Sequence, residues 1–412
     1  MALNTSIRHA SAFKPISIPV LADVDRANWD RVQSFSASTT QPQENLYELG
    51  RLLKMAVDKG ILEATASITQ FEYGTITSYL QVANLAAEPS GGFDLDDFDA
   101  GRLDFVCPGK DAYGGTLEQT LWLEHMSLDS LTIGINADDR LTREFAFSGE
   151  SAKIARYGNK YVVFVSDDAP SGTSGSYDII LSDPAPVADP NNAGVYILKV
   201  YRIRAGVATE LAITTDYTWT NGTTTLNIIA GLAADNYRIW YTAASYGSAG
   251  DPQALNDADD YYLRSENVTV TLDDGVNTPI ELTALTSLSV AATFNRTDNA
   301  VIGTNVKIKD TESFDVTVAL GGFVKSFPIE EALMGQAGQS WTIIDYSLFA
   351  EVDVIVKVYQ EAAKSTFLIG YKVSDAVFAD SDANSFDANS FGSGSLNLNS
   401  DNLLITTTFG DL

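Results

Sequence analysis

The chain has 412 residues, more than a single hydrophobic core usually accommodates, so two or three domains are expected. Its formal net charge of −28 repels nucleic-acid phosphates and disfavours tight DNA binding. The single cysteine, Cys107, excludes an intramolecular disulfide framework. With only His9 and His125, the chain is poorly supplied for a histidine metal site or a Ser-His-Asp triad.

The N-terminal part of the chain lacks the apolar core of a signal peptide, and no run reaches the roughly 18 apolar residues that a membrane span needs. We therefore expect a protein that is made and kept in the cytoplasm until it assembles. Residues 1–43 are rich in Ser, Thr, Ala and Pro and predict an extended arm, with a disordered segment as the alternative.

A first β-domain is expected at residues 44–170. Leucines at helical spacing predict a helix over 42–60 that ends at Gly60. Residues 61–85 mix β-branched and aromatic types and predict strands, and a Gly- and Asp-rich turn follows. A hairpin near 131–147 and a strand at 161–165 complete this domain.

A smaller module is expected at residues 171–250, between two linkers rich in Ser, Gly, Pro and Asp. Its short strands alternate with turn residues, and the Asn-Gly pair at 221–222 is a strong hairpin signal. This pattern is typical of a small Ig-like β-sandwich, although it lacks the cysteine pair. We expect an accessory module that lies outside the main core and can be removed.

Residues 251–412 predict a second β-domain. Pro328 is suited to the first turn of a helix, with Glu330 and Glu331 near the positive end of its dipole. A hairpin near 355–371 follows, and a tandem DANSF repeat at 382–391 predicts an exposed loop between strands.

The hairpins at 131–147 and 355–371 resemble each other in their period-two alternation. The sequence separation between Leu131 and Phe147 is the same as that between residue 355 and Tyr371. Two similar hairpins also occur by chance in β-proteins of this size. The similar flanking segments favour a duplicated domain instead, and whole-domain repeats are typical of pseudo-symmetric assemblies.

No residue pattern in the chain nominates a catalytic site. Asp380, Asp382 and Asn384 resemble the opening of a calcium loop, but Ser385 and Phe391 stand where that loop needs Gly and Glu. The acidic cluster at residues 94–99 is interpreted as a solvated turn. Neither phosphate-binding glycine motif occurs in a supporting context. We therefore expect no enzyme, no cofactor and no catalytic, cofactor-binding or metal-binding residue.

A series of motifs carries a family resemblance over about residues 44–165. In order they read NLYELGRL, ILEATASITQFEYG, LDFVCPGKD, TLEQTLWLEHMSLDSLTIGI, TREFAFSGESAKI and GNKYVVF. Together they resemble the core of the major tail (tail tube) proteins of tailed bacterial and archaeal viruses. The positions that match the family pattern are Arg143, Phe145, Gly149, Glu150, Asn159, Lys160 and Tyr161. Residues 251–412 resemble the family only through the hairpin, the Pro328 helix and the segment SDNLLIT.

The resemblance implies a mainly β fold: two tandem tube-type β-sandwich or barrel domains with short helices, and an Ig-like β-sandwich between them. It implies a structural virion protein whose rings stack into the tail tube, the conduit for DNA ejection. Three chains would form each ring, with a pseudo-sixfold lumen. The implied partners are the chain itself, tape-measure and tail-terminator proteins, and viral DNA that passes without specific binding. The protein would lie in the virion tail, away from membranes, after assembly in the host cytoplasm.

Two alternatives stay open. One is a different virion structural protein, such as a capsid decoration or a fibre or adhesin. The other is a glycan-binding or calcium-dependent β-sandwich protein, suggested by Trp219, Trp240 and the Asp-rich loops. From the net charge we further expect that the lumen of an assembled tube is predominantly acidic.

Overall fold

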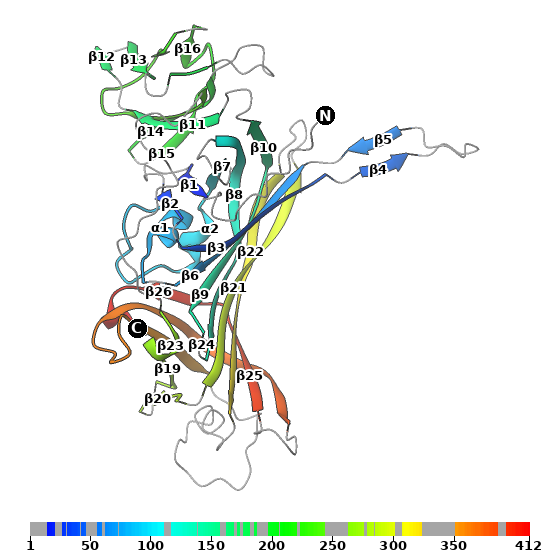
Figure 1. Cartoon of the computed structure of the whole chain (residues 1–412), viewed down its shortest axis with the longest axis vertical. Coiled ribbons are helices and arrows are strands. Elements are labelled where there is room, and N and C mark those ends of the chain that lie inside the picture. The colour runs from blue at the N-terminus through cyan, green and yellow to red at the C-terminus, as the bar shows by residue number, and fades with distance from the viewer. Residues whose placement is uncertain are drawn as a thin grey trace, which may run out of the picture.

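The computed structural model describes most of the chain. The described residues are 15–20, 27–29, 31–41, 43–46, 56–59, 62–72, 74–110, 117–137, 139–156, 162–168, 171–173, 176–181, 185–187, 197–205, 207–220, 223–243, 263–275, 278–283, 285–300, 307–323, 351–385 and 393–412. The expectation of a mainly β fold, with a β-sandwich between two larger β-units in chain order, is confirmed. A 16-stranded sheet forms the body, and two four-stranded sheets form the sandwich (Figure 1).

The first copy of the repeated unit spans residues 16–156. Its elements are β1 Ile16–Pro19, β2 Ala27–Asn28, β3 Val32–Thr40, β4 Gln43–Leu46, β5 Ala56–Lys59, β6 Glu63–Phe71, α1 Thr77–Ala83, α2 Leu95–Asp99, β7 Leu103–Lys110, β8 Leu117–Asn136, β9 Thr142–Gly149 and β10 Ser151–Arg156.

The second copy spans residues 268–406. Its elements are β19 Val268–Asp273, β20 Ile280–Glu281, β21 Leu285–Ala300, β22 Lys307–Phe323, β23 Val352–Tyr359, β24 Phe367–Ser385, β25 Ser393–Ser400 and β26 Leu403–Thr406. The short 3₁₀ helices η4 Ser265–Asn267 and η6 Phe409–Asp411 flank it.

Apart from the extra pair β4·β5 of the first copy, the strand pairings of the two copies match one for one, and all are antiparallel. In the first copy β3 pairs with β6, β6 with β9, β9 with β8, β8 with β7 and β10, and β7 with β1. In the second copy β21 pairs with β22, β22 with β25, β25 with β24, β24 with β23 and β26, and β23 with β19. Even the small pairs β1·β2 and β19·β20 correspond. One topology therefore occurs twice in the chain.

The long central strands β8 and β24 carry the same irregularity. In each, the register to the preceding strand shifts by one residue beside a non-glycine residue with positive φ, His125 at 50° and Asp375 at 52°. An aspartate of the preceding strand accepts the backbone N–H of that residue in both copies. Asp104 Oδ1 lies 2.9 Å from His125 N, and Asp353 Oδ1 lies 3.1 Å from Asp375 N. A shared bulge with a shared side-chain cap is much stronger evidence of duplication than similar topology alone.

This correspondence corrects the pairing of hairpins expected from sequence. The hairpin near 355–371 is β23·β24, and its counterpart is β7·β8 rather than β8·β9. Alternating apolar residues mark a strand with one buried face, but they do not identify which neighbour it pairs with. The strands of residue 355 and Tyr371 thus match β7 and β8, and the aspartate that matches Asp353 is Asp104.

Within the helix expected at 42–60, residues 43–46 and 56–59 form strands instead, and the other residues of that segment lie outside the described ones. β4 and β5 pair antiparallel and continue the hairpin β3·β6 away from the body (Figure 1). β1 and β3, within the segment expected to be an arm, are paired strands of the large sheet. Residues 77–83, expected as strand, form α1. The Pro328 helix and the second half of the DANSF repeat lie outside the described residues.

One hydrophobic core runs through both copies. In β6 the buried apolar side chains are Ala64, Ala66 and Ile68, and in the matching strand β22 they are Val316, Val318 and Leu320. Trp29 fills the centre of the first copy, with edge-to-face contacts to Phe105, Phe145 and Phe147. Among the described residues, no helix is both long enough and apolar enough to cross a membrane.

The sandwich lies at one end of the molecule (Figure 1). Its strands are β11 Val162–Asp168, β12 Ser171–Thr173, β13 Ser176–Ile180, β14 Ile197–Arg204, β15 Val207–Glu210, β16 Tyr217–Trp219, β17 Thr225–Ile228 and β18 Asn236–Ala243. One sheet has the order β11-β18-β14-β15 and the other β12-β13-β17-β16. The strand at 161–165 was expected to close the first β-domain. Instead β11 pairs with β18, which alternation alone could not reveal.

Candidate functional surface

One face of the large sheet is a continuous polar surface that crosses both copies. A single row of cross-strand partners runs from β3 to β25. It consists of Ser34, Thr69, Glu144, Thr132, Ala291, Thr317 and Asn399. Neighbouring rows are similar, with hydroxyl pairs such as Ser36···Ser67 at 2.9 Å and Ser38···Thr65 at 2.7 Å. The apolar core lies on the opposite face, since side chains alternate along each strand. We call this surface the polar face.

The charged residues of the polar face are acidic. Glu63, Glu144, Asp315 and Asp380 stand on its rows, and among the described row positions there is no lysine or arginine. Lys309 reaches the rim, where its Nζ lies 3.9 Å from a Glu63 carboxylate oxygen. The face therefore carries hydroxyls, amides and negative charge, a combination that does not attract a polyanion.

The two copies are joined along a seam in this sheet. Residues 130–136 of β8 pair with residues 287–293 of β21. Beyond the seam the hairpin β21·β22 continues along the first copy, where Arg296 lies 3.3 Å from Asp99 and Thr311 also donates to Asp99. The sheet thus passes from one copy to the next without a break.

Behind the seam, a fully buried polar network links the two copies. Arg143 and Glu72 form an ion pair at 3.5 Å in which both side chains are 0% exposed. The Tyr371 hydroxyl, from the second copy, donates to Glu72 at 2.6 Å and lies 3.2 Å from the Tyr79 hydroxyl. Burial and the Glu72 charge raise the pKa of Tyr79 to about 12, so it stays a neutral donor. The network fixes how the copies sit against each other.

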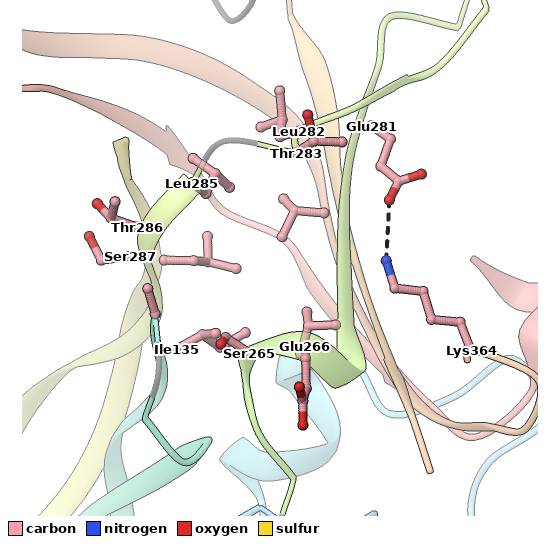
Figure 2. A pocket seen from close by; sticks show the side chains of 14 residues that line it. Ile135, Ser265, Glu266, Glu281, Leu282, Thr283, Leu285, Thr286, Ser287 and Lys364 are labelled. Atoms are coloured by element: carbon pink, nitrogen blue, oxygen red, sulfur yellow. Dashed lines mark hydrogen bonds and ion pairs between the residues drawn. The ribbon is translucent and has the colours of Figure 1, made fainter. Parts of the chain in front are cut away.

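A pocket of about 230 Å³ lies beside the seam (Figure 2). Its wall combines aliphatic and hydroxyl side chains from both copies, such as Ile135 and Thr286. Lys364 and Glu281 form an ion pair at 3.4 Å on one side. The lysine is thus paired with a carboxylate. We interpret the pocket as a packing gap between the copies.

The sandwich is docked on the first copy through a mixed interface. Its apolar part consists of Ile18, Val20, Val106 and Trp122 of the first copy with Tyr201 and Trp240 of the sandwich. Its charged part centres on Glu124, which lies 2.7 Å from Lys199 of the sandwich and 2.6 Å from Lys153. Despite burial, these two lysines lower the pKa of Glu124 to about 2.

His125 bridges the same junction. One ring nitrogen lies 3.1 Å from Glu150 and the other 2.9 Å from the Tyr201 hydroxyl of the sandwich. Burial and Lys199 lower the pKa of His125, but the Glu150 hydrogen bond and the Asp104 charge outweigh them, so the pKa is raised.

We expect this histidine to make the docking of the sandwich pH-dependent. A histidine whose pKa is raised in the folded state adds to the free energy of unfolding. This contribution is fully present below the pKa of the unfolded state, about 6.5, and it is lost as the pH rises through the pKa of the folded state. Unfolding monitored in urea between pH 6 and pH 8.5 should show stability falling with pH. His125→Gln should flatten this dependence, whereas His9→Gln should retain it. An unchanged slope in His125→Gln would show that His125 does not titrate there.

The residues of the family-like motif have structural roles here. Arg143 belongs to the buried network, Phe145 to the core, and Glu150 to the sandwich junction. Gly149 is needed for space, because a Cβ there would lie 2.7 Å from the Glu124 carbonyl oxygen. Residues 159–161 lie outside the described residues.

The acidic clusters and tryptophans noted in the sequence also have local explanations. Asp94 accepts the Asp97 N–H at 2.9 Å and caps α2. Asp380 accepts from Asn397 on the polar face. Trp240 is 0% exposed at the sandwich junction, so it is not a platform for a glycan ring, and the partly buried Trp219 packs against the sandwich core. Among the described residues, no group of three His, Cys, Asp or Glu side chains is placed to hold a metal ion.

The polar face and the seam were not predicted as such. The alternating Ser and Thr of residues 34–40 and 63–69 are a usable signal, because they place small polar side chains on one face of two adjacent strands. The seam has no local signal, since it joins segments more than 150 residues apart.

No protein-family model and no curated protein matches the chain. Part of the chain is similar to a solved structure of the anti-feeding prophage cap, a tube-terminating cap, at 20% identity. The match covers 39% of this chain and 98% of that one, with a TM-score of 0.29. The PVC sheath–tube complex of an extracellular contractile injection system, in its extended state, matches at 16% identity over 36% and 94%, with a TM-score of 0.26. Likeness at these TM-scores does not assign a function.

Proposed function

We propose that this chain is a non-catalytic structural protein that polymerises into rings, which stack as the tube of a phage-tail-like particle. The observation that carries the proposal is the seam: two copies of one fold stand side by side in one sheet through the pairing of β8 with β21. At its two ends such a chain exposes β24 and β3, which are the counterparts of β8 and β21, the two strands that meet at the seam.

Open edges support a polymer. In the described part of the chain, β3 pairs only with β6, and the outer half of β24 pairs only with β25. Exposed strand edges of this length promote uncontrolled aggregation unless something covers them. A head-to-tail contact whose rotation closes gives a ring, in which the edges of β3 and β24 are both covered.

The internal duplication favours three chains per ring. If each ring holds six equivalent copies, as the tail tube resemblance implies, three chains supply them and the lumen is pseudo-sixfold. The sandwich, which packs on the first copy in the described part of the chain, would then decorate the outside of the ring.

The polar face is the surface we assign to the lumen. It is acidic and hydroxyl-rich, so it would let DNA slide without being held. In this role the chain would act with tape-measure and tail-terminator proteins in a virion tail assembled in the host cytoplasm.

Electron microscopy and light scattering of the purified full-length chain test the proposal. We expect hollow rings or tubes with three chains per layer, and a lumen lined by the polar face in a reconstruction. A protein that stays monomeric at high concentration contradicts the proposed function. Six chains per ring would contradict the symmetry alone, and a Lys- and Arg-lined channel would contradict the lumen assignment.

A further inference from the structure

We infer that a second copy of this chain binds β24 through its own β3, in the register that the seam already shows within the chain. This inference rests on the proposed function, because it names the contact that would close the ring. The partner is fixed by the duplication: β8 and β21 meet at the seam, and their counterparts are β24 and β3.

The register follows from the shared bulges. The pairing of β8 with β9 shifts between Leu128 and Ser130, and that of β24 with β25 shifts between Phe378 and Asp380. Ser130 therefore corresponds to Asp380.

The counterpart of β21 is aligned through its partner strand. Ala66 of β6 corresponds to Val318 of β22, because they lie opposite matching residues of β9 and β25. On the other side, Ala66 pairs with Ala37 and Val318 pairs with Val290, so Ala37 corresponds to Val290. Counting from Val290 to Thr293 gives Thr40 as the counterpart of Thr293.

The seam pairs Ser130 with Thr293. The same contact between chains places Asp380 of one chain opposite Thr40 of the next. Both side chains are exposed in the single chain, on the polar face.

Exposed apolar side chains lie where this contact would cover them. Ile154 on β10 is 63% exposed, whereas its counterpart on β26, Ile405, is 0% exposed. Ile405 is covered by the first copy, where its backbone exchanges hydrogen bonds of 2.7 and 2.9 Å with Phe93. Because Ile405 lies on the side of the second copy that faces the first, its counterpart Ile154 should lie on the β3 side of the first copy. A neighbouring second copy would cover it there in the same way.

The opposite end of the chain shows the same contrast. Val377 on β24 is 46% exposed, and its counterpart on β8, Ser127, is 2% exposed. Ser127 pairs with Ser148, which receives a hydrogen bond from Lys309 of the hairpin β21·β22. The neighbour's hairpin β3·β6 would take that place over Val377. Exposed apolar groups on both ends thus match buried positions of the seam.

Cysteine cross-linking of the full-length chain tests the register. Residues directly opposite in an antiparallel pair have Cβ atoms about 4.5–5.5 Å apart, while diagonal pairs are further apart. The double variant Asp380→Cys, Thr40→Cys, oxidised with oxidised glutathione, should give covalent dimers and closed trimers on a non-reducing gel. Each single variant, and the shifted pair Asp380→Cys, Ser38→Cys, should give few. Cys107 can stay, because its thiol is buried and burial raises its pKa.

Microscopy of the same samples separates the two ideas. If rings form but only the shifted double variant cross-links, or neither double variant does, the register is wrong and the proposed function still stands. Absence of rings in the wild-type chain overturns the proposed function itself.

A surface variant provides a second, independent test. Ile154→Glu should convert rings to folded monomers at concentrations where the wild-type chain is assembled. Val207→Glu, at a residue of the sandwich that is 62% exposed, is the matched control and should assemble normally. Normal assembly of Ile154→Glu would contradict the inferred contact.

Discussion

Arg143→Leu should lower the free energy of unfolding by about 3–5 kcal/mol, because it leaves a carboxylate buried without its cation. Arg143 and Glu72 are both 0% exposed, and Tyr371 of the second copy donates to the same carboxylate. Loss of the cation should therefore weaken the contact between the copies as well as the first copy itself. Urea unfolding of the full-length chain, followed by tryptophan fluorescence, measures the change.

A double-mutant comparison distinguishes loss of the charge pair from loss of packing. Arg143→Leu with Glu72→Gln removes the uncompensated charge and should be more stable than Arg143→Leu alone. Tyr371→Phe removes the hydrogen bond to Glu72 and the contact with the Tyr79 hydroxyl, and it should cost about 1–3 kcal/mol. If the double variant is no more stable than Arg143→Leu, the buried charge is not the cause of the destabilisation.

Removal of the sandwich should leave the duplicated sheet folded but make it associate non-specifically. Deleting residues 162–243, with a short linker, uncovers the apolar side chains that the sandwich covers, which include Ile18, Val106 and Trp122. Exposed contiguous apolar patches of this kind promote aggregation. Light scattering and binding of a hydrophobic dye should both rise strongly, while the circular dichroism signal of β-structure should persist.

The sequence suggested a removable module at 171–250, and the structure explains why a deletion of that segment should behave worse. That deletion removes β18 and leaves β11 without its partner. In the 162–243 deletion, Ile18→Thr with Val106→Thr should restore solubility, because it makes the uncovered patch less apolar. If the double substitution does not reduce dye binding, the exposed surface lies elsewhere. Loss of β-structure on deletion would show that the sandwich completes the fold.

Sequence patterns identified strands well where one face is buried and the other is polar. The alternation at 131–135 and 352–358 corresponds to β8 and β23, and the duplication it suggested is present. The partner strands were assigned wrongly, because a period of two is the same for every strand with one buried face. The helix expected at 42–60 is wrong at residues 43–46 and 56–59, where helical spacing of leucines did not outweigh the pairing of β4 with β5.

The functional surfaces were less accessible to sequence reasoning. Net charge suggested an acidic lumen, and the polar face is acidic. The residues of this face could not be named from the sequence, because its rows combine seven strands from both copies. Glu72 and Tyr371 are 299 positions apart, and no local pattern marks either as a partner of the other. Long-range contacts of this kind depend on the packing of the whole fold.

Covalent connection of the two copies changes how an assembly of this chain would respond to dilution. Contacts at the seam form within one molecule, where tethering gives effective concentrations on the order of millimolar. Contacts between β3 and β24 depend on the concentration of free chains. A ring would therefore come apart into intact pairs of copies and never into single ones. Substitutions at the seam would alter the thermal stability of the chain, whereas substitutions at the two outer edges would alter only the concentration at which assembly begins.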